Sequence, residues 1–423
     1  MLYKMPHVSR TNLGEYITSF FLIKLNTDLQ DGISLYDQLN GKEMATFVHE
    51  YLHFLQDITT TTGLARFISV SKLIQTCIYE IYQSEDPVEL PYPLNKSSVE
   101  NAAAESEIQA FYLGSDEYLG IHHIDSIQLE RESLLDEWIP DPNGICAVNL
   151  YFDNERKPYI FGSNCIRESI SYLIEYLKFG AEVRNKEFPY NSCEMVCEFL
   201  YPELAERKDV IVLLAEYSLM HYHSGRMFFE LVQKMKHIEA AKLSFNQVEK
   251  ICLEETAHLN ESFKDVCQGI EEAIDFLYPL NTQFSQANNY LKRLITKGTE
   301  YKMRYHSPMT QFLRFNSIFA FSYFRTLTSE IGLPLISNNR YETFSTEVDL
   351  SYFLVPIAFY QLFFCLGQPR CYMHQYCEMA EHPCLDRILC NCSPWKQTEK
   401  EELCPFATLW YHYLLTGKEI KKS

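Results

Sequence analysis

The sequence predicts an α+β fold that is predominantly helical, with a small antiparallel sheet near the N-terminus. Residues 15–25 are rich in β-branched and aromatic types, a composition typical of a strand. From residue 165 onward, almost every segment has the apolar spacing of a helix. Hydrophobic residues make up 47% of the 423 residues and only 15 are Gly, so the chain can build a sizeable core and is not a disordered protein.

The N-terminal part of the chain predicts strands that surround two helices. Pro-rich residues 83–98 read as a loop and 99–144 are polar and acidic, so we interpret 83–144 as an insertion. In chain order, we expect a strand over 15–25, a short strand over 33–36, a buried helix between 41–42 and 59–63, a helix over 64–82, and strands over 147–152 and 158–161.

The remainder predicts helices, without a fixed-period repeat. These helices are expected over 165–179, 204–222, 226–241, 245–278, 284–300, 308–330 and 349–366. The strongest apolar run, 352–366, is shorter than the roughly 20 residues that a membrane span needs and contains Pro356 and Gln361, so a buried helix is expected there and no membrane span.

The net charge and the cysteine content indicate which binding partners and which cellular compartment to expect. The net charge of −19 argues against nucleic acid as a partner, because phosphate binding requires clustered Lys and Arg. The first seven residues show no apolar signal region, and 14 cysteines without such a signal predict reduced thiols or metal ligands. We therefore expect a cytoplasmic protein.

The segment with the clearest chemistry is His49-Glu50-Tyr51-Leu52-His53. Residues four apart share one face of a helix, so the two imidazoles can bind one zinc ion. Glu50 lies beside them and can take a proton from a water that the zinc binds. The surrounding residues are apolar nearly all round, which indicates a buried helix in which ionisable groups need partners. The alternative is a helix with two core histidines and a chance Glu.

A catalytic zinc usually has three protein ligands, so a third must come from elsewhere. The best candidate is Glu168, near the start of a predicted helix that follows a predicted strand. Alternatively, Glu168 lies on a solvated face opposite an apolar stripe, and Glu216 in another apolar helix is the second candidate ligand. Asp57 is disfavoured, because eight helical residues from His49 correspond to about 12 Å.

The His49-Glu50-x-x-His53 motif resembles that of the zincin metallopeptidases, and the segment from Glu168 to Glu175 is similar to the gluzincin branch, in which a second helix supplies Glu as the third ligand. Ser169 stands where that branch often has Gly. The resemblance implies Zn²⁺ as cofactor and hydrolysis of peptide bonds in a protein or peptide substrate. It also implies a zincin-like catalytic domain, which we place at residues 1–240 with the insertion at 83–144, followed by a helical region at 241–423.

The resemblance further implies an electrophile for the substrate oxyanion, a Tyr or His from the helical region. Tyr217 and His223 are the favoured candidates, although for each one taken singly aromatic packing or a surface imidazole is the stronger interpretation. Other candidates are Tyr222, His221 and His306. Gln56, Asp57 and Glu175 are candidates to orient the ligating histidines, and the strands at 17–25 or 33–36 are candidates to bind substrate backbone.

The C-terminal tail contains seven of the 14 cysteines between positions 365 and 404. This density predicts a second metal site, for which Cys371, Cys377, Cys384 and Cys404 are the candidate ligands. The spacing lacks paired C-x2-C motifs, so buried core thiols are the alternative.

Two other functions remain compatible with these patterns. One is a zincin-like scaffold that has lost catalysis, although the presence of Glu50 argues against it. The other is a helical interaction protein that binds metal through its cysteine tail. Metal analysis of variants at His49, Glu50 and His53 separates them from a zinc-dependent metallopeptidase.

Overall fold

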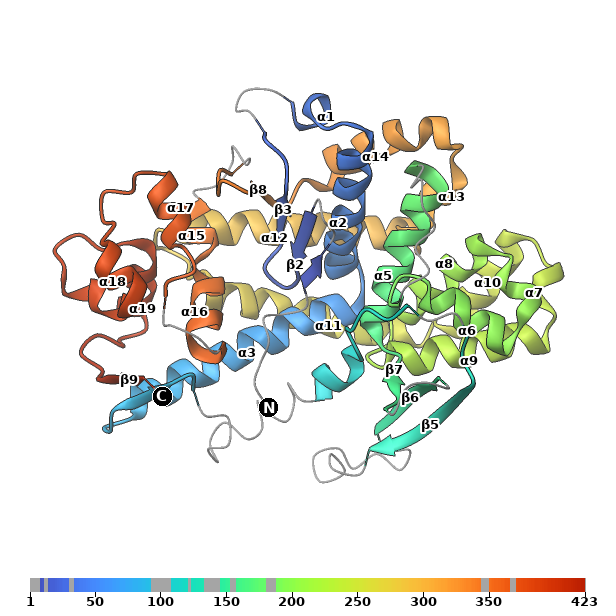
Figure 1. The fold of residues 1–423 in the computed structure, drawn as a ribbon, viewed down its shortest axis with the longest axis horizontal. Coiled ribbons are helices and arrows are strands. Elements are labelled where there is room, and N and C mark those ends of the chain that lie inside the picture. The colour runs from blue at the N-terminus through green and yellow to red at the C-terminus, as the bar shows by residue number, and fades with distance from the viewer. Residues whose placement is uncertain are drawn as a thin grey trace.

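The structure is a computed structural model of the 423-residue chain. It describes residues 8–10, 14–29, 34–92, 108–120, 123–132, 145–152, 157–179, 188–343, 350–365 and 370–422. Helices dominate these residues and three small sheets accompany them, so the predicted α+β, mostly helical fold is confirmed (Figure 1).

The N-terminal sheet has the strand order β1-β2-β3-β8. Its strands are β1 (Val8–Arg10), β2 (Gly14–Ile17), β3 (Leu22–Leu25) and β8 (Leu335–Asn338). The first three pair antiparallel, but β8 pairs parallel with β3, Leu22 opposite Leu335. The sheet is therefore mostly antiparallel near the N-terminus, as predicted, and β8 joins it in parallel from a distant part of the chain.

The single strand predicted over 15–25 is instead a hairpin. The chain reverses between β2 and β3, where Ser19 and Phe21 have positive φ values of 65° and 49°. No Gly or Pro marks this turn, and an unbroken apolar run hides it in the sequence. The strand predicted over 33–36 was also wrong where the structure describes it, because Leu35–Gln38 form helix α1; residue 33 lies outside the described part.

Two long helices follow, α2 (Gly41–Thr59) and α3 (Thr61–Gln83), close to their predicted limits. Asn40 caps α2: its side chain accepts hydrogen bonds from the backbone N–H groups of Lys42 and Glu43, and the Glu43 side chain accepts one from the Asn40 N–H. Helix α2 packs against β2, β3, α3 and the later helices α5 (Ser163–Ile174) and α12 (Ser285–Tyr305). It is therefore the central element of the fold.

The region interpreted as an insertion is described only in parts, since 93–107 and 133–144 lie outside the described residues. Strand β4 (Val88–Leu90) pairs parallel with β9 (Ile420–Lys422). Strand β5 (Ser126–Glu132) pairs antiparallel with β6 (Ile145–Tyr151), which pairs with β7 (Tyr159–Ile160). The two predicted strands over 147–152 and 158–161 correspond to β6 and β7.

The helical remainder begins with α5, which continues into a π-helical turn, η2 (Glu175–Phe179). The other helices are α6 (Ser192–Leu200), α7 (Pro202–Ala205), α8 (Lys208–Ser218), α9 (Ser224–His237), η3 (Ala240–Lys242), α10 (Phe245–Glu255), α11 (Leu259–Leu277), α12, α13 (Gln311–Arg314), α14 (Ser317–Ile331), α15 (Leu350–Phe353), α16 (Val355–Phe364), α17 (His374–Met379), α18 (Arg387–Cys392), η4 (Pro394–Glu399) and α19 (Pro405–His412). Several predicted helices are thus interrupted, for example 349–366 at Leu354, just before Pro356.

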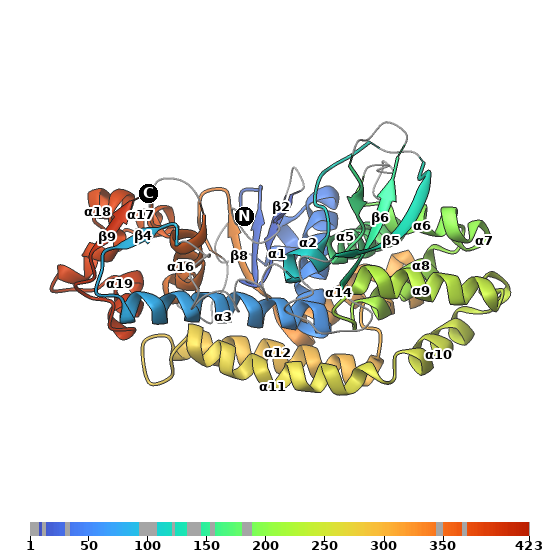
Figure 2. The same ribbon diagram turned by 90° about the horizontal axis from the view of Figure 1, so that it is seen from below.

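Figures 1 and 2 show an elongated arrangement with α2 near the middle, α6–α10 at one end and α16–α19 at the other. The proposed domain division at residue 240 stays a prediction. Elements from both sides of it are joined, since β3 pairs with β8 and α12 packs on α2.

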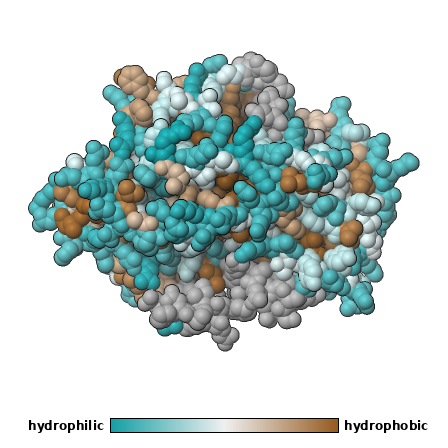
Figure 3. Space-filling view, turned by 180° about the vertical axis from the view of Figure 1, so that it is seen from behind, coloured by the Kyte–Doolittle hydropathy of each residue, from teal (hydrophilic) through white to brown (hydrophobic). Residues whose placement is uncertain are grey.

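In the described part of the chain, no helix combines the length and apolar character needed to cross a membrane. Hydrophilic residues cover most of the face in Figure 3, and hydrophobic residues form small separate patches on it.

Candidate metal centre

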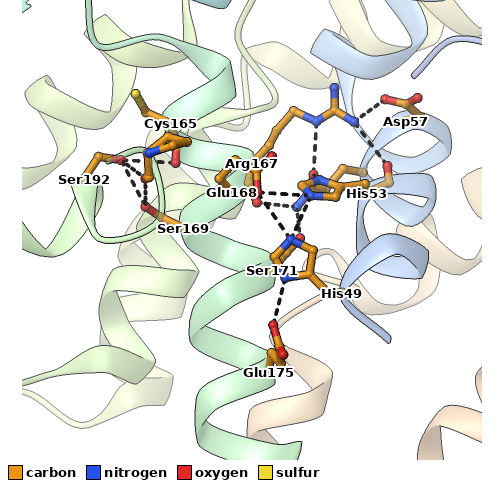
Figure 4. Close-up of polar contacts among 12 residues, drawn as sticks. His49, His53, Asp57, Cys165, Arg167, Glu168, Ser169, Ser171, Glu175 and Ser192 are labelled. Carbon is orange, nitrogen blue, oxygen red and sulfur yellow. Dashed lines mark hydrogen bonds and ion pairs between the residues drawn. The ribbon is translucent and has the colours of Figure 1, made fainter. Parts of the chain in front are cut away.

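The two motif histidines lie on one buried face of α2. His49 is 1% exposed and His53 2%, and their ring centroids are 4.9 Å apart. Their Nε2 atoms are separated by 3.2 Å, so both rings turn the same nitrogen toward a common point. Figure 4 shows the two rings directed from α2 toward α5.

Helix α5 brings Glu168 to this point. Its Oε2 lies 3.3 Å from His49 Nε2 and 3.4 Å from His53 Nε2, and the residue is 1% exposed. The alternative of a solvated Glu168 is therefore excluded. Within the described residues, His49, His53 and Glu168 are the one group of three such side chains whose ligand atoms all lie within 4.8 Å of one another.

Neighbouring side chains determine which ring nitrogens carry protons. His49 Nδ1 lies 3.0 Å from Glu175 Oε2, and His53 Nδ1 lies 3.1 Å from Gln56 Oε1. The Gln56 amide orientation is set because its Nε2 donates to the Arg167 carbonyl at 3.1 Å. Both Nδ1 atoms therefore face acceptors, so each ring in its neutral form carries its proton on Nδ1 and has a lone pair on Nε2.

Two nitrogen lone pairs and a carboxylate oxygen thus converge at separations of 3.2, 3.3 and 3.4 Å. Three acceptors at this spacing repel one another unless a positive charge lies between them. Zinc binds nitrogen and oxygen at about 2.0–2.1 Å, and a tetrahedron of that radius has edges of about 3.3–3.4 Å. The three separations are therefore compatible with a tetrahedral metal site, with one position left for another ligand.

Without a metal ion, a proton can supply only part of the positive charge that the three acceptors need. Burial lowers the pKa of His49, but the carboxylates of Glu168 and Glu175 outweigh it and the net shift is well upward. Burial lowers the pKa of His53. Burial acts to raise the pKa of Glu168, yet the two imidazoles hold it well below its ordinary value. One proton on His49 Nε2 satisfies one contact, whereas a divalent cation satisfies all three acceptors.

Glu50 lies beside this group and is 0% exposed. Neither of its carboxylate oxygens has a hydrogen-bond partner among the described residues. Burial raises the pKa of Glu50 well above its ordinary value. A buried carboxylate without donors is costly, so this carboxylate is positioned for a ligand that donates protons.

Strand β2 passes directly over Glu50. A Cβ added at Gly14 would lie 2.7 Å from Thr46 Cγ2 and 3.3 Å from Glu50 Cγ. The first contact is closer than two carbon atoms can approach, so the backbone of β2 can lie this close to α2 only because residue 14 has no side chain.

A buried ion pair fixes α5 against α2. Arg167 Nη2 donates to Asp57 Oδ1 at 2.7 Å and to the His53 carbonyl at 3.3 Å, and Arg167 Nε donates to Gln56 Oε1 at 3.1 Å. Tyr16 from β2 donates to Asp57 Oδ2 at 2.8 Å. Asp57 therefore does not ligate the centre; it anchors the arginine beside Glu168 (Figure 4).

The opposite face of α5 holds a turn that carries Tyr190. Ser169 Oγ donates to the Pro189 carbonyl at 3.3 Å and lies 3.1 Å from Ser192 Oγ. The Tyr190 ring lies 6.1 Å from the His49 ring. The pKa of Tyr190 is raised, mainly by burial and to a smaller extent by Glu168 and other neighbouring groups. Sequence reasoning missed this residue, since it precedes a helix without any local motif; the hydroxyl of Ser169, in place of the Gly of the gluzincin pattern, is used to hold its turn.

The other predicted candidates lie in different surroundings. Glu216 accepts hydrogen bonds from the backbone N–H groups of Met309 and Thr310 at 3.0 and 2.9 Å, and burial raises its pKa to about 7. Glu216 is therefore a structural carboxylate and not part of the His49 group. The Lys302 ammonium lies over the Tyr217 ring, 5.6 Å from its centroid.

The candidate His223 uses both ring nitrogens in the structure. Its Nε2 donates to the Cys146 carbonyl, and its Nδ1 accepts a hydrogen bond from the Arg226 N–H at 3.2 Å. His221 Nδ1 accepts a hydrogen bond from the His223 N–H. Tyr222 is 40% exposed and lies beside α3 and α11. His306 is the C-terminal capping residue of α12. No hydrogen bond, ion pair or ring contact found among the described residues links these candidates to His49 or His53.

Comparisons with protein-family models, curated proteins and solved structures returned no match to this chain. The functional argument therefore depends on the residues themselves.

Replacing Glu175 by Gln tests the hydrogen bond behind His49. We expect zinc affinity to fall about 10–100-fold, since a carboxylate that accepts the Nδ1–H makes the ring a stronger ligand. Competition with a chromophoric chelator measures this. Replacement of the exposed Glu203 by Gln is the control, and equal affinities of the two variants would contradict the assigned role.

Proposed function

We propose that this chain is a zinc-dependent metallopeptidase with a zincin-like core, which hydrolyses peptide bonds in a protein or peptide substrate. The observation that carries the proposal is the convergence of His49 Nε2, His53 Nε2 and Glu168 Oε2 at tetrahedral spacing, beside the unpaired carboxylate of Glu50. Glu50, Glu168 and Glu175 form no ion pair with Lys or Arg among the described residues, so a divalent cation also balances their charge.

Zinc bound by His49, His53 and Glu168 would supply a Lewis acid that makes a water acidic and polarises the substrate carbonyl. Glu50 then takes the proton of the attacking water and delivers it to the leaving amine. Its orientation is held because β2 packs against its side chain at Gly14. Glu175 and Gln56 keep the two Nδ1–H groups engaged, so both rings present Nε2 throughout the reaction.

Tyr190 is the residue we assign to the substrate oxyanion, in place of Tyr217 and His223. Its ring lies 6.1 Å from the His49 ring, whereas both ring nitrogens of His223 are engaged elsewhere; the Tyr190 hydroxyl is hydrogen-bonded to Tyr118 and has to turn from it to reach a substrate. Replacing Tyr190 by Phe removes one donor, so we expect kcat to fall about 10²–10³-fold with little change in KM. Steady-state kinetics on one cleaved peptide measures both. An unchanged kcat would remove Tyr190 from the mechanism, and Tyr82→Phe on the surface is the control.

The centre is closed in this structure, since the four central residues are at most 2% exposed. Among the described residues, β2 packs on Glu50 and the turn that carries Tyr190 lies beside His49, so we expect one of these elements to move when a substrate carbonyl approaches Glu50. This requirement favours a peptidase that acts on a restricted set of substrates.

Removal and return of zinc tests the function. The full chain is incubated with a library of unstructured peptides, and new termini are identified by mass spectrometry. We expect cleavage that stops after chelation and returns with one equivalent of Zn²⁺ per His49–His53–Glu168 centre. A chain that binds zinc through His49 and His53 but cleaves nothing would instead support a catalytically silent scaffold, the alternative that the complete burial of the centre favours.

A further inference from the structure

The C-terminal cysteines are not arranged around a metal position. Within the described residues, no three of their sulfurs lie within 4.8 Å of one another. Burial raises the pKa of Cys371, and it raises the pKa of Cys404 to about 11, which favours neutral thiols in the core. The structure therefore gives no support to the predicted second metal site at Cys371, Cys377, Cys384 and Cys404.

Aromatic side chains, in contrast, come together beside the candidate metal centre. Four tyrosines form a continuous row of rings, here called the tyrosine row. The Tyr190 ring lies 6.1 Å from the His49 ring, centroid to centroid. The rings of Tyr118 and Tyr172 lie 5.8 and 5.9 Å from that of Tyr190. Tyr172 stacks in turn on Tyr176 at 6.2 Å, with the ring planes 24° apart.

The exposure of these rings rises with the distance from His49 along the row. Tyr190 and Tyr172 are 7% and 5% exposed, whereas Tyr118 and Tyr176 at the two ends are 46% and 39% exposed. The row thus presents aromatic surface to solvent at both ends and touches a candidate metal ligand in between. Any molecule that lies on its ends is close to the candidate metal centre.

The π-helical turn η2 carries one end of the row. Its first residue, Glu175, lies against His49, and the next residue, Tyr176, is exposed (Figure 4). Turns of this kind that follow or interrupt an α-helix are frequent at functional sites. The exposed ring is therefore one residue away from the carboxylate that holds a candidate metal ligand.

Exposed apolar residues at the start of α14 lie next to this turn. Lys178 of η2 donates hydrogen bonds to the Leu313 and Phe315 carbonyls at 3.3 and 2.7 Å, and α14 packs on η2. Ile318 and Phe319 are 79% and 60% exposed. Grouped exposed apolar side chains are typical of a surface that binds another molecule.

The charged groups of this surface are already engaged. The Glu175 carboxylate lies 3.0 Å from His49 Nδ1, and the Lys178 ammonium bonds to two carbonyls. Residues 175–179 and 315–319 contain no other charged side chain. An acidic or basic group of a ligand would find no unpaired partner on them, whereas ring faces attract aromatic and aliphatic groups.

We propose that the tyrosine row binds an aromatic or large aliphatic side chain of the peptide substrate near the bond that is cleaved, with Tyr176 as the specificity-determining contact. The inference rests on the proposed function, because hydrolysis at the metal centre makes a peptide the expected occupant. The row is continuous with that centre through His49, so side chains next to a carbonyl bound there lie within reach of the rings.

Matched peptides test this contact. Blocked alanine peptides that carry Phe, Ala or Glu at one central position are given to the zinc-loaded full chain. We expect kcat/KM to be about 10-fold higher for the Phe peptide than for the other two, since only its ring is buried against the row. Tyr176→Ala should remove this advantage, mainly through KM, and leave the rate for the Ala peptide unchanged.

Tyr79→Ala is the matched control, because Tyr79 is 59% exposed on α3. It should keep the preference for Phe. Equal kcat/KM values for the three peptides with the wild type overturn the inference. A fall that is the same for all three peptides in Tyr176→Ala also overturns it, because a purely structural role has that effect.

Binding without turnover separates this inference from the proposed function. Zinc-loaded Glu50→Gln is titrated with a fluorophenylalanine peptide, whose fluorine NMR line broadens on binding. The Phe peptide should displace this probe at a concentration about 10-fold lower than the Ala peptide, and Glu50→Gln/Tyr176→Ala should abolish the difference. If the preference is present but the wild type cleaves no peptide, the binding site stands and the peptidase proposal fails. If peptides are cleaved but the probe shows no preference, the peptidase stands and the tyrosine row is not its subsite.

Discussion

The variant Glu50→Gln should lose peptide hydrolysis by about 10²–10⁴-fold while its zinc content stays unchanged. Gln has almost the shape of Glu but cannot accept the proton of the attacking water. The carboxylate oxygens of Glu50 hydrogen-bond to none of the described residues, so the substitution disrupts no structural bond found there. Initial rates at subsaturating peptide give kcat/KM, and metal analysis of the same sample gives the zinc content.

Glu198→Gln is the matched control for this experiment, because Glu198 is exposed on α6. It should keep full activity and full zinc. If Glu50→Gln retains wild-type hydrolysis, Glu50 is not the base and the proposed mechanism is wrong. If the variant loses its zinc, its loss of activity says nothing about proton transfer and Glu50 has a structural role at the centre.

The second large effect is expected for Glu168→Ala, which should weaken zinc binding at the His49 centre more than 100-fold. Loss of a neighbouring hydrogen-bond partner alone costs 10–100-fold, and this substitution removes a ligand atom that lies 3.3–3.4 Å from both imidazole nitrogens. A 100-fold loss in affinity reduces the stabilisation by excess zinc by about 2.7 kcal/mol. Thermal unfolding with and without zinc measures this difference.

Two further variants test whether the loss of zinc affinity is specific to Glu168. Glu203→Ala, at an exposed position on α7, should keep the zinc-dependent shift in unfolding temperature. Glu216→Ala tests the other candidate ligand, and it should destabilise the chain equally with and without zinc because Glu216 bonds to Met309 and Thr310. A zinc-dependent shift that survives in Glu168→Ala and disappears in Glu216→Ala would reverse the assignment.

Local signals made helix α2 predictable, because the apolar surroundings, the residues that mark its ends and the four-residue spacing of His49 and His53 all lie within one segment. The Asn40 cap was not part of that prediction. The proposed third ligand, Glu168, lies 119 residues from His49, so no spacing rule reaches it. Its position at the start of a helix after a strand and the resemblance to gluzincins singled it out. Tyr190 was missed because its position depends on hydrogen bonds between Ser169 and the turn before α6.

The sheet was harder to predict for a physical reason. The chain reverses between β2 and β3 through positive φ angles at Ser19 and Phe21, which these residue types rarely adopt. No sequence pattern predicts this turn. The partner of β3 comes from residues 335–338, whose four-residue strand is too short to give a periodic signal. Tertiary pairing, not local preference, determined this part of the fold.

The parallel pairing of β3 with β8 has a consequence for synthesis of the chain. Residues 22–25 and α2 leave the ribosome early, but the sheet beneath α2 is complete only after residue 338 has been translated. Contacts between such distant segments slow folding and leave apolar surface uncovered in the meantime. Until β8 has been made, helix α2, which is buried from Met44 to Thr59 in the folded chain, therefore lacks part of its cover.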